Sequence, residues 1–216
     1  MKLSALVLSS LLFVTVAHAG VFGLETGDRK IENVNIATSA AITTGSETQK
    51  LELLGAGLRA KKVLVTNVKV YVTQVFVDDA SKFDRSSTAA ALASLDNMKA
   101  GAIRLTFLRD VDAGTVQVSF RDALEANNVD INEQGVASFL NAVKDGADAQ
   151  NGKSMNMSLT KLEDGTVQVV YENTKGEEET VVGDAKLFTA IFSIWLGTPA
   201  DSGLATLQKA LLKGLN

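Results

Sequence analysis

The segment that decides the fold is LELLGAGLRAKKVLVTNVKVYVTQVFV, residues 51–77. It is rich in β-branched residues, which favour strands, and from Val68 onward apolar and polar side chains alternate. A period of two is what a strand with one face in a core requires. Gly55 and Gly57 allow a bend or a close backbone approach, and the break at Thr66-Asn67 leaves room only for a tight hairpin. The segment is therefore predicted to form an antiparallel meander over about 51–58, 60–66 and 68–77.

Residues 1–19 have the features of a secretory signal peptide. Lys2 supplies a positive start, residues 3–16 are apolar, and Ala17-His18-Ala19 is a small-x-small cleavage site before Gly20. The apolar run is too short for a membrane span, and no stop-transfer segment follows it. Because the cleavage site lacks a lipobox cysteine, we expect a soluble periplasmic protein, cleaved after Ala19.

Cleavage at that point limits the chemistry available to the remaining chain. It removes His18, the single histidine, and the sequence has no cysteine. Ser-His-Asp and Cys-His catalysis are thereby excluded, together with the ordinary ligands of zinc, copper and haem. We therefore expect no cofactor and no metal.

The charge of the chain also argues against polyanionic partners. Without Lys2, 20 basic residues face 25 acidic ones, which changes the net charge from −4 to −5. Nothing in the sequence is basic enough to single out nucleic acid or an anionic membrane as a partner. We expect a monomer that has no membrane span and no nucleic-acid partner.

The rest of the chain is consistent with a single α+β domain over residues 20–216. The part before residue 50 is polar, with one strand expected near 34–42. Asp164-Gly165 and Lys175-Gly176 are typical hairpin turns, while Asp201 is placed to cap the last helix. The remaining strands are predicted over 102–108, 153–161, 166–172 and 178–182, and the helices over 88–97, 113–128, 132–145, 185–196 and 202–213.

Two signatures occur in this order along the chain. The first is L-x-L-L-G-x-G-x-R followed by V-K-V-Y-V-x-x-V-F-V, and the second is A-I-F-S-I-W-L-G-x-P-x-D-x-x-L. Together they resemble the chalcone isomerase superfamily over about residues 45–212. The closer resemblance is to its non-plant, bacterial chalcone-isomerase-like branch, which is non-catalytic and similar to fatty-acid-binding proteins. The resemblance implies an open-faced β-sandwich, in which helices cover one face of a large antiparallel sheet and a ligand cleft lies between the layers.

The resemblance also implies where the site lies. Arg59 stands where the plant isomerases hold the substrate phenolate. Tyr71 takes the place of a threonine that helps to polarise the ketone, as in the fatty-acid-binding members. Phe120 and Asn127 match a tyrosine and an asparagine of the isomerases, and Ile194 matches a threonine. Two cleft hydroxyls are thus replaced by hydrocarbon, and the set that would activate a ketone is largely lost.

An arginine and a tyrosine at the polar end of an apolar cleft suit a carboxylate with a hydrocarbon tail. We therefore expect a non-catalytic protein that binds a fatty-acid-like or other amphipathic anion, with no catalytic residue. Two alternatives remain: an isomerase or lyase using Arg59 and Tyr71, and an accessory protein whose cleft is filled by its own side chains. Without the resemblance, Arg59 would be read as a surface arginine, Tyr71 as structural, Asn127 as a helix cap, and Phe120 as core.

Overall fold

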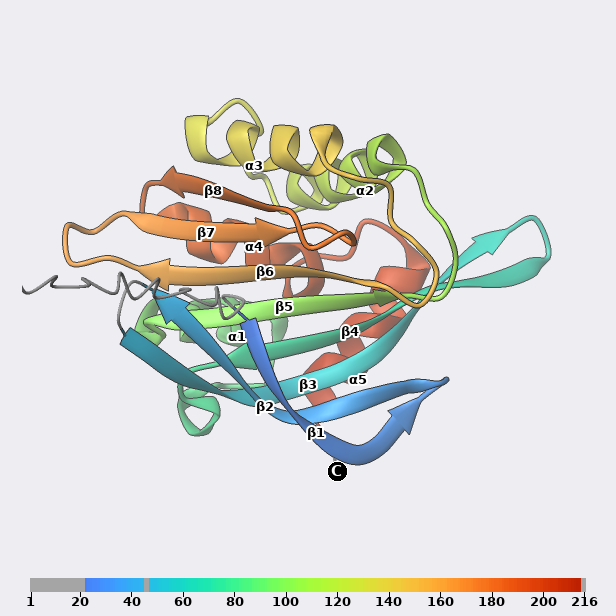
Figure 1. Ribbon diagram of the computed structural model, residues 1–216, viewed down its shortest axis with the longest axis horizontal. Helices are drawn as coiled ribbons and strands as arrows, with labels where there is room; N and C mark the ends of the chain where they lie inside the picture. The colour runs from blue at the N-terminus through green and yellow to red at the C-terminus, as the bar shows by residue number, and fades with distance from the viewer. Residues whose placement is uncertain (1–21, 45–46, 215–216) are drawn as a thin grey trace, which may run out of the picture.

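The computed structural model describes residues 22–44 and 47–214; the predicted signal peptide lies outside these residues. In the described part, eight strands form one antiparallel sheet in the order of the sequence, and five α-helices pack on one of its faces (Figure 1). The predicted α+β, open-faced architecture is confirmed. The strands are β1 (Phe22–Ile31), β2 (Val34–Thr44), β3 (Glu47–Val63), β4 (Thr66–Val77), β5 (Ala100–Phe107), β6 (Ser154–Lys161), β7 (Val167–Glu172) and β8 (Glu178–Gly183). The helices are α1 (Thr88–Ser94), α2 (Ala113–Ala126), α3 (Gln134–Asp145), α4 (Lys186–Leu196) and α5 (Ser202–Lys213).

The central meander has two long strands where three were predicted. β3 runs without interruption through Gly55 and Gly57, and the hairpin turns at Leu64-Val65, two residues before the predicted position. The prediction placed the turn wrongly because Leu64 adopts the left-handed region (φ 55°), which is normally expected of glycine, asparagine or aspartate. The turn therefore carries none of the residues that normally mark one.

Gly55 and Gly57 act in helix packing instead of in a bend. A Cβ on Gly55 would collide with the carbonyl oxygen of Leu211, and one on Gly57 would lie 2.7 Å from Leu207 Cδ1. Both contacts are with α5, which lies along β3. The glycines thus let a helix backbone approach the strand closely.

A β-bulge changes which side chains of β4 face the helices. Arg59 pairs with Tyr71 and Ala60 with Lys69, so Val70 is an extra residue on β4. A bulge shifts the alternation of faces, and Val70 consequently packs against the helix-side core, whereas Val72 packs on the opposite face. The prediction that β4 alternates regularly from Val68 onward, with one face in the core, is therefore wrong.

The N-terminal region forms two strands where one was predicted. β1 is mostly exposed, so it lacks the alternation that would have revealed it. The β1–β2 hairpin curls over the free face of the sheet (Figure 1), and Ile36 of β2 packs there with Ala56 and Val72. This second, smaller core lies on the face opposite the helices.

The second half of the chain agrees with the sequence expectations. Gly165 and Gly176 take positive φ in their hairpin turns, α4 is buried almost all round, and Asp201 caps α5. Only one helix boundary changes markedly: the predicted helix 88–97 is α1 followed by a short 3₁₀ turn, Leu95–Asn97.

Candidate functional site

Arg59 is a buried cation beneath the start of α5. It is the third residue, after Gly55 and Gly57, on the side of β3 that α5 covers, and it is only 6% exposed. Its Nη2 donates to Asp201 Oδ2 at 2.5 Å, and its Nη1 donates to the carbonyl of Ala60 at 2.6 Å. A Cβ on Gly203 would collide with the guanidinium. The G-x-G-x-R motif is thus one continuous surface that receives α5.

Asp201 compensates a charge arrangement that would otherwise be unfavourable. A cation beside a helix N-terminus meets the positive end of the helix dipole. Oδ1 of Asp201 accepts from the backbone N–H groups of Gly203 and Leu204, while Oδ2 holds Arg59. Burial raises the pKa of Asp201, but the bond from Leu204 and the charge and hydrogen bond of Arg59 outweigh it and leave that pKa below its ordinary value. The carboxylate therefore stays ionised at neutral pH.

Tyr71 is buried next to Arg59 and opposite it in the β3–β4 ladder. Its hydroxyl oxygen accepts from Trp195 Nε1 at 3.3 Å. Burial raises the pKa of Tyr71, although the charge of Arg59 and the bond from Trp195 act in the opposite direction. The phenol is therefore protonated at neutral pH, and no acceptor for its proton is found among the described residues.

Two adjoining cavities meet at Arg59 and Tyr71 on the helix side of the sheet. One has a volume of about 300 Å³ and the other about 260 Å³. The larger cavity is walled mainly by Val68, Val70, Phe107, Val116 and Phe120, with Arg109, Asp110 and Asp112 among its polar residues. Ile194, Asp201 and Leu204 line the smaller one. The arrangement places a guanidinium and a hydroxyl between a larger cavity that is mainly apolar and a smaller one that is mainly polar.

The structure brings together four of the five side chains predicted for the site. Arg59, Tyr71 and Phe120 line both cavities and Ile194 lines one of them. Phe120 also meets Trp195 edge-on, with ring centroids 5.2 Å apart.

Asn127 lies elsewhere, at the C-terminal end of α2. Its amide nitrogen donates to the carbonyls of Ala123, Ser193 and Thr198, and its oxygen accepts from Thr198 N at 2.6 Å. These bonds join the ends of α2 and α4 and use the whole amide, so we leave Asn127 out of the proposed site.

Sequence reasoning missed Asp201 and Trp195 as members of the site. Asp201 was recognised as a helix cap, yet its bond to Arg59 spans 142 residues of sequence. Trp195 lies in α4, which is apolar on nearly all sides. The hydrophobic periodicity of this helix therefore does not reveal which residue accepts from the indole N–H of Trp195. The D-x-x-L cap signature near the end of the chain was the one available signal for Asp201.

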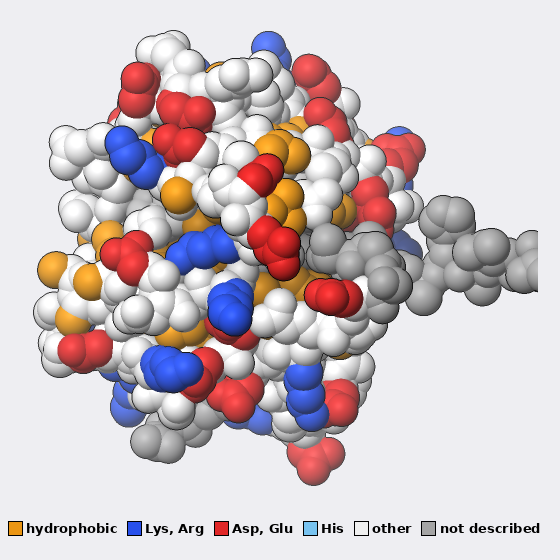
Figure 2. Space-filling view, turned by 90° about the vertical axis from the view of Figure 1, so that its left-hand side faces the viewer, with side chains coloured by type: hydrophobic (Ala, Val, Ile, Leu, Met, Phe, Trp, Pro, Cys, Tyr) orange, Lys and Arg blue, Asp and Glu red, His pale blue; other side chains and the backbone are white. Residues whose placement is uncertain are grey.

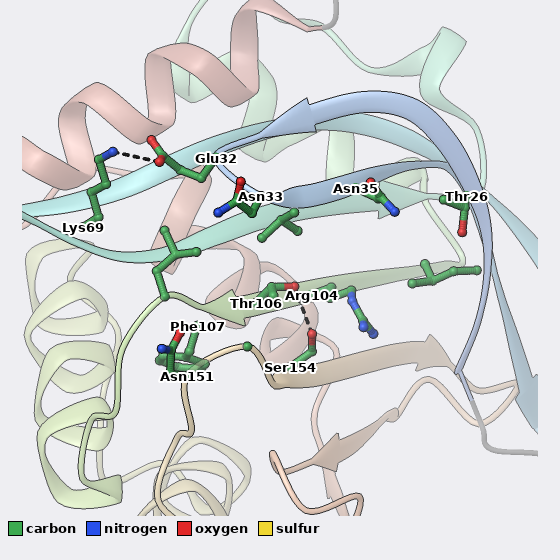
Figure 3. A pocket seen from close by; sticks show the side chains of 14 residues that line it. Thr26, Glu32, Asn33, Asn35, Lys69, Arg104, Thr106, Phe107, Asn151 and Ser154 are labelled. Carbon is green, nitrogen blue, oxygen red and sulfur yellow. Dashed lines mark hydrogen bonds and ion pairs between the residues drawn. The ribbon is translucent and has the colours of Figure 1, made fainter.

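A third cavity, of about 640 Å³, lies on the opposite face, between the β1–β2 hairpin and strands β5 and β6 (Figure 3). Arg104 projects into it and donates to Asn156 Oδ1 at 3.0 Å, and Thr106 and Ser154 share a 2.9 Å hydrogen bond. Its walls are mainly polar, including Thr26, Asn33, Asn35 and Asn151. These polar walls distinguish it from the larger helix-side cavity and suit an apolar tail poorly.

The described residues form neither a metal cluster nor a membrane-spanning helix. Within the ranges 22–44 and 47–214, no group of three or more His, Cys, Asp or Glu side chains is placed to hold a metal ion. None of the helices in these ranges has the length and the hydropathy that a membrane span requires.

Comparison with known proteins identifies the fold. The family model described as chalcone isomerase-like matches residues 28–213. Among solved structures, an Arabidopsis thaliana fatty-acid binding protein matches with a TM-score of 0.53 and 18% identity, over 80% of this chain and 95% of that chain. At that identity the likeness concerns the fold alone. No curated protein matches the sequence.

Proposed function

Because the chain belongs to the chalcone isomerase-like family, we propose that it binds an amphipathic anion of the fatty-acid type, without catalysis. The observation that carries this proposal is the meeting of a buried guanidinium and a buried, protonated phenol at the junction of two cavities, of which the larger is mainly apolar. The fatty-acid binding protein of Arabidopsis thaliana, which has the same fold, adds support.

The carboxylate would be held by Arg59 and Tyr71. A guanidinium has five N–H donors, and Arg59 uses Nη1 and Nη2 toward Ala60 and Asp201. The Tyr71 oxygen already accepts from Trp195, which leaves its O–H free to donate. A ligand carboxylate would accept from the phenol and compete with Asp201 for the guanidinium, so orientation is the main contribution of the head group.

The hydrocarbon tail would supply most of the binding free energy. Burial of each CH₂ contributes about 0.8 kcal/mol, so a few methylenes outweigh a single head-group contact. The larger cavity, about 300 Å³, is at the small end of the range of ligand pockets. We therefore expect short- and medium-chain acids to fit as the cavity stands, and long-chain acids to require Phe120 or the β3–β4 hairpin to move.

The same features argue against turnover. A general base or acid works best when its pKa is near the working pH, and burial moves the pKa of Tyr71 further above neutrality. Phe120 and Ile194 bring hydrocarbon to the cavities. In an isomerase using Arg59 and Tyr71, the phenol would thus be a poor base at neutral pH.

One observation favours the accessory-protein alternative. Asp201 already occupies one edge of the Arg59 guanidinium, as a ligand carboxylate would. If this ion pair persists in the presence of a ligand, Asp201 neutralises Arg59 and the pair only stabilises the fold. The ion pair therefore makes Arg59 the residue on which the two alternatives differ.

We also propose that the protein is exported and acts in the periplasm. Support comes from the sequence alone: Lys2, the apolar run 3–16 and the Ala17-His18-Ala19 cleavage pattern. The mass of the protein recovered from the periplasmic fraction should correspond to a chain that begins at Gly20. Recovery of the uncleaved chain from the cytoplasm would contradict export.

Calorimetric titration with decanoate and with decanol tests the binding proposal. The two ligands share a tail and differ in charge, so decanoate should bind more tightly and lose that advantage in Arg59→Gln. Arg104→Gln, on the opposite face of the sheet, is the matched control and should bind as the unmodified protein does. Equal affinity for both ligands, or none for either, would refute the head-group assignment.

A further inference from the structure

The tip of the β3–β4 hairpin exposes two large apolar side chains. The hairpin projects beyond the body of the protein, at the right of Figure 1. Its turn consists of Leu64, which is 90% exposed, and Val65, which is 94% exposed. These fractions exceed those of the other exposed large apolar side chains among the described residues.

Turn chemistry does not account for this pair of residues. Leu64 has φ 55°, in a region that asparagine, aspartate or glycine enters more easily than a bulky residue does. A polar turn would be both less strained and more soluble. Leucine and valine at the tip therefore cost stability and solubility, which indicates that their apolar surface is used.

The strands that carry the tip are basic in an acidic protein. From Leu53 to Val77 the sequence contains no aspartate or glutamate but has Arg59, Lys61, Lys62 and Lys69, whereas the whole chain has a net charge of −4. Lys69 is paired with Glu32 at 2.7 Å. Lys61 and Lys62 are exposed, and within the described residues neither forms a salt bridge. Two unpaired cations thus lie just behind the apolar tip.

The described side chains at the opposite end of the protein are arranged differently. Figure 2 views the end away from the hairpin tip, where acidic and basic side chains are interspersed and apolar patches are small. The net negative charge of the whole chain, which argued against an anionic membrane as a partner, hides the difference in charge between the tip and the rest of the protein. Charge and apolar surface come together at the tip.

We propose that this tip docks the protein on an anionic lipid bilayer. Leu64 and Val65 would enter the boundary between head groups and acyl chains, while Lys61 and Lys62 would contact lipid phosphates. Lys61 precedes Leu64 by three residues, a rise of about 10 Å in a strand. That separation matches the depth of about 5–10 Å to which interfacial apolar side chains are buried.

The tip is also connected to the candidate site. Lys61 lines both cavities beside Arg59, and Val68 lines the larger one. An amphipathic acid leaving the bilayer at the tip would reach Arg59 along the same two strands. This delivery role rests on the proposed function, whereas docking on the bilayer does not.

Co-sedimentation with lipid vesicles tests the docking proposal. The ligand-free chain from Gly20 onward is mixed with phosphatidylcholine vesicles, or with vesicles containing equal parts of phosphatidylcholine and phosphatidylglycerol. We expect sedimentation with the anionic vesicles, weakened by salt. Lys61→Gln and Lys62→Gln should each reduce the partition about fivefold, and the double variant Leu64→Ser/Val65→Ser about tenfold or more.

Matched variants away from the tip serve as controls. Val118→Ser/Val182→Ser removes two exposed apolar side chains elsewhere, and Lys175→Gln/Lys209→Gln removes two exposed lysines. Both should sediment as the unmodified protein does, and unchanged thermal unfolding of the tip variants would show that they fold.

Three results would overturn the proposal. They are no sedimentation with either vesicle, equal sedimentation with both, and sedimentation that survives Leu64→Ser/Val65→Ser. The first would assign the tip to a protein partner instead. Because the assay uses no fatty acid, its result is independent of the titration with decanoate, and either proposal can fail without the other.

Discussion

The carboxylate of Asp201 caps α5 with one oxygen and pairs with the guanidinium of Arg59 with the other, at 2.5 Å. The arginine side chain is 7% exposed and the aspartate side chain 40%. One residue thus joins the end of the chain to its central strand and neutralises the cation of the candidate site. The affinity for an anionic ligand and the stability of the fold are therefore coupled at this pair.

Asp201→Asn should separate the two effects. Asparagine keeps an oxygen that caps α5 but lacks the negative charge, so the buried Arg59 loses its counterion. The free energy of unfolding should therefore fall by about 1–2 kcal/mol. Decanoate should bind more tightly, because it no longer competes with Asp201. Asp184→Asn, near the start of α4, is the control, since in the described structure Asp184 forms no salt bridge. Weaker binding of decanoate by Asp201→Asn would contradict the competition.

The same pair predicts a dependence of stability on pH. The pKa of Asp201 lies below its ordinary value of 3.8, so its contribution to stability is fully present above that value and is lost as the pH falls through the lowered pKa. The stability difference between the unmodified protein and Asp201→Asn should therefore be constant near neutrality and shrink in acid. Chemical unfolding across this range measures it, and a difference that grows in acid would be inconsistent with the pair.

Tyr71 and Tyr171 form a natural comparison. Tyr71→Phe removes the donor proposed for the carboxylate and leaves Trp195 Nε1 without its partner, so decanoate affinity should fall about tenfold and stability by about 1–3 kcal/mol. In the described structure the buried hydroxyl of Tyr171 has no hydrogen-bond partner. Tyr171→Phe should therefore leave binding unchanged and stability equal or higher. Similar effects of both substitutions would show that Tyr71 has no special role.

Gly57→Ala tests how α5 is seated. The new methyl group would lie 2.7 Å from Leu207 Cδ1 and 3.0 Å from Ala210 Cβ, so we expect a loss of about 1–3 kcal/mol from overpacking. In Gly114→Ala the nearest atom is 3.4 Å away, and the higher helix propensity of alanine should add about 0.5–1 kcal/mol. Denaturant unfolding of both variants gives the comparison. A neutral Gly57→Ala would mean that the glycine serves no packing purpose.

Asn127→Ala distinguishes a structural amide from a ligand contact. Loss of its bonds to α4 and the following loop should destabilise the fold by about 2–3 kcal/mol, with decanoate affinity unchanged. Asn141→Ala, at an exposed position of α3, should be close to neutral. A loss of affinity without a loss of stability in Asn127→Ala would return this residue to the site.

The fold was largely predictable because its signals are local. The glycine turns at Gly165 and Gly176 and the cap at Asp201 depend on neighbouring residues. The exceptions lack a local signal. The exposed strand β1 and the bulge at Val70 depend on pairing with another strand, and the turn at Leu64 uses a residue that seldom adopts positive φ.

Four side chains of the candidate site could be predicted from the sequence, but Asp201, Trp195 and the contacts that they make could not. Family resemblance placed Arg59, Tyr71, Phe120 and Ile194 in one region, and the structure brings them together. The resemblance did not reveal that Arg59 is paired with Asp201, because that contact depends on how α5 packs against β3. For Asn127 the resemblance implied a cleft amide, whereas the helix ends that it joins occupy its hydrogen bonds.

In the proposed function, Arg59 holds the carboxylate of an amphipathic ligand. Native mass spectrometry of the protein purified without denaturation, followed by solvent extraction, measures this most directly. We predict a stoichiometric amphipathic acid on the unmodified protein and its depletion from Arg59→Gln. An unmodified protein that carries no acid, and that fatty acids do not stabilise against heat, would show that Arg59 holds no such ligand and would leave the cleft a structural part of the fold.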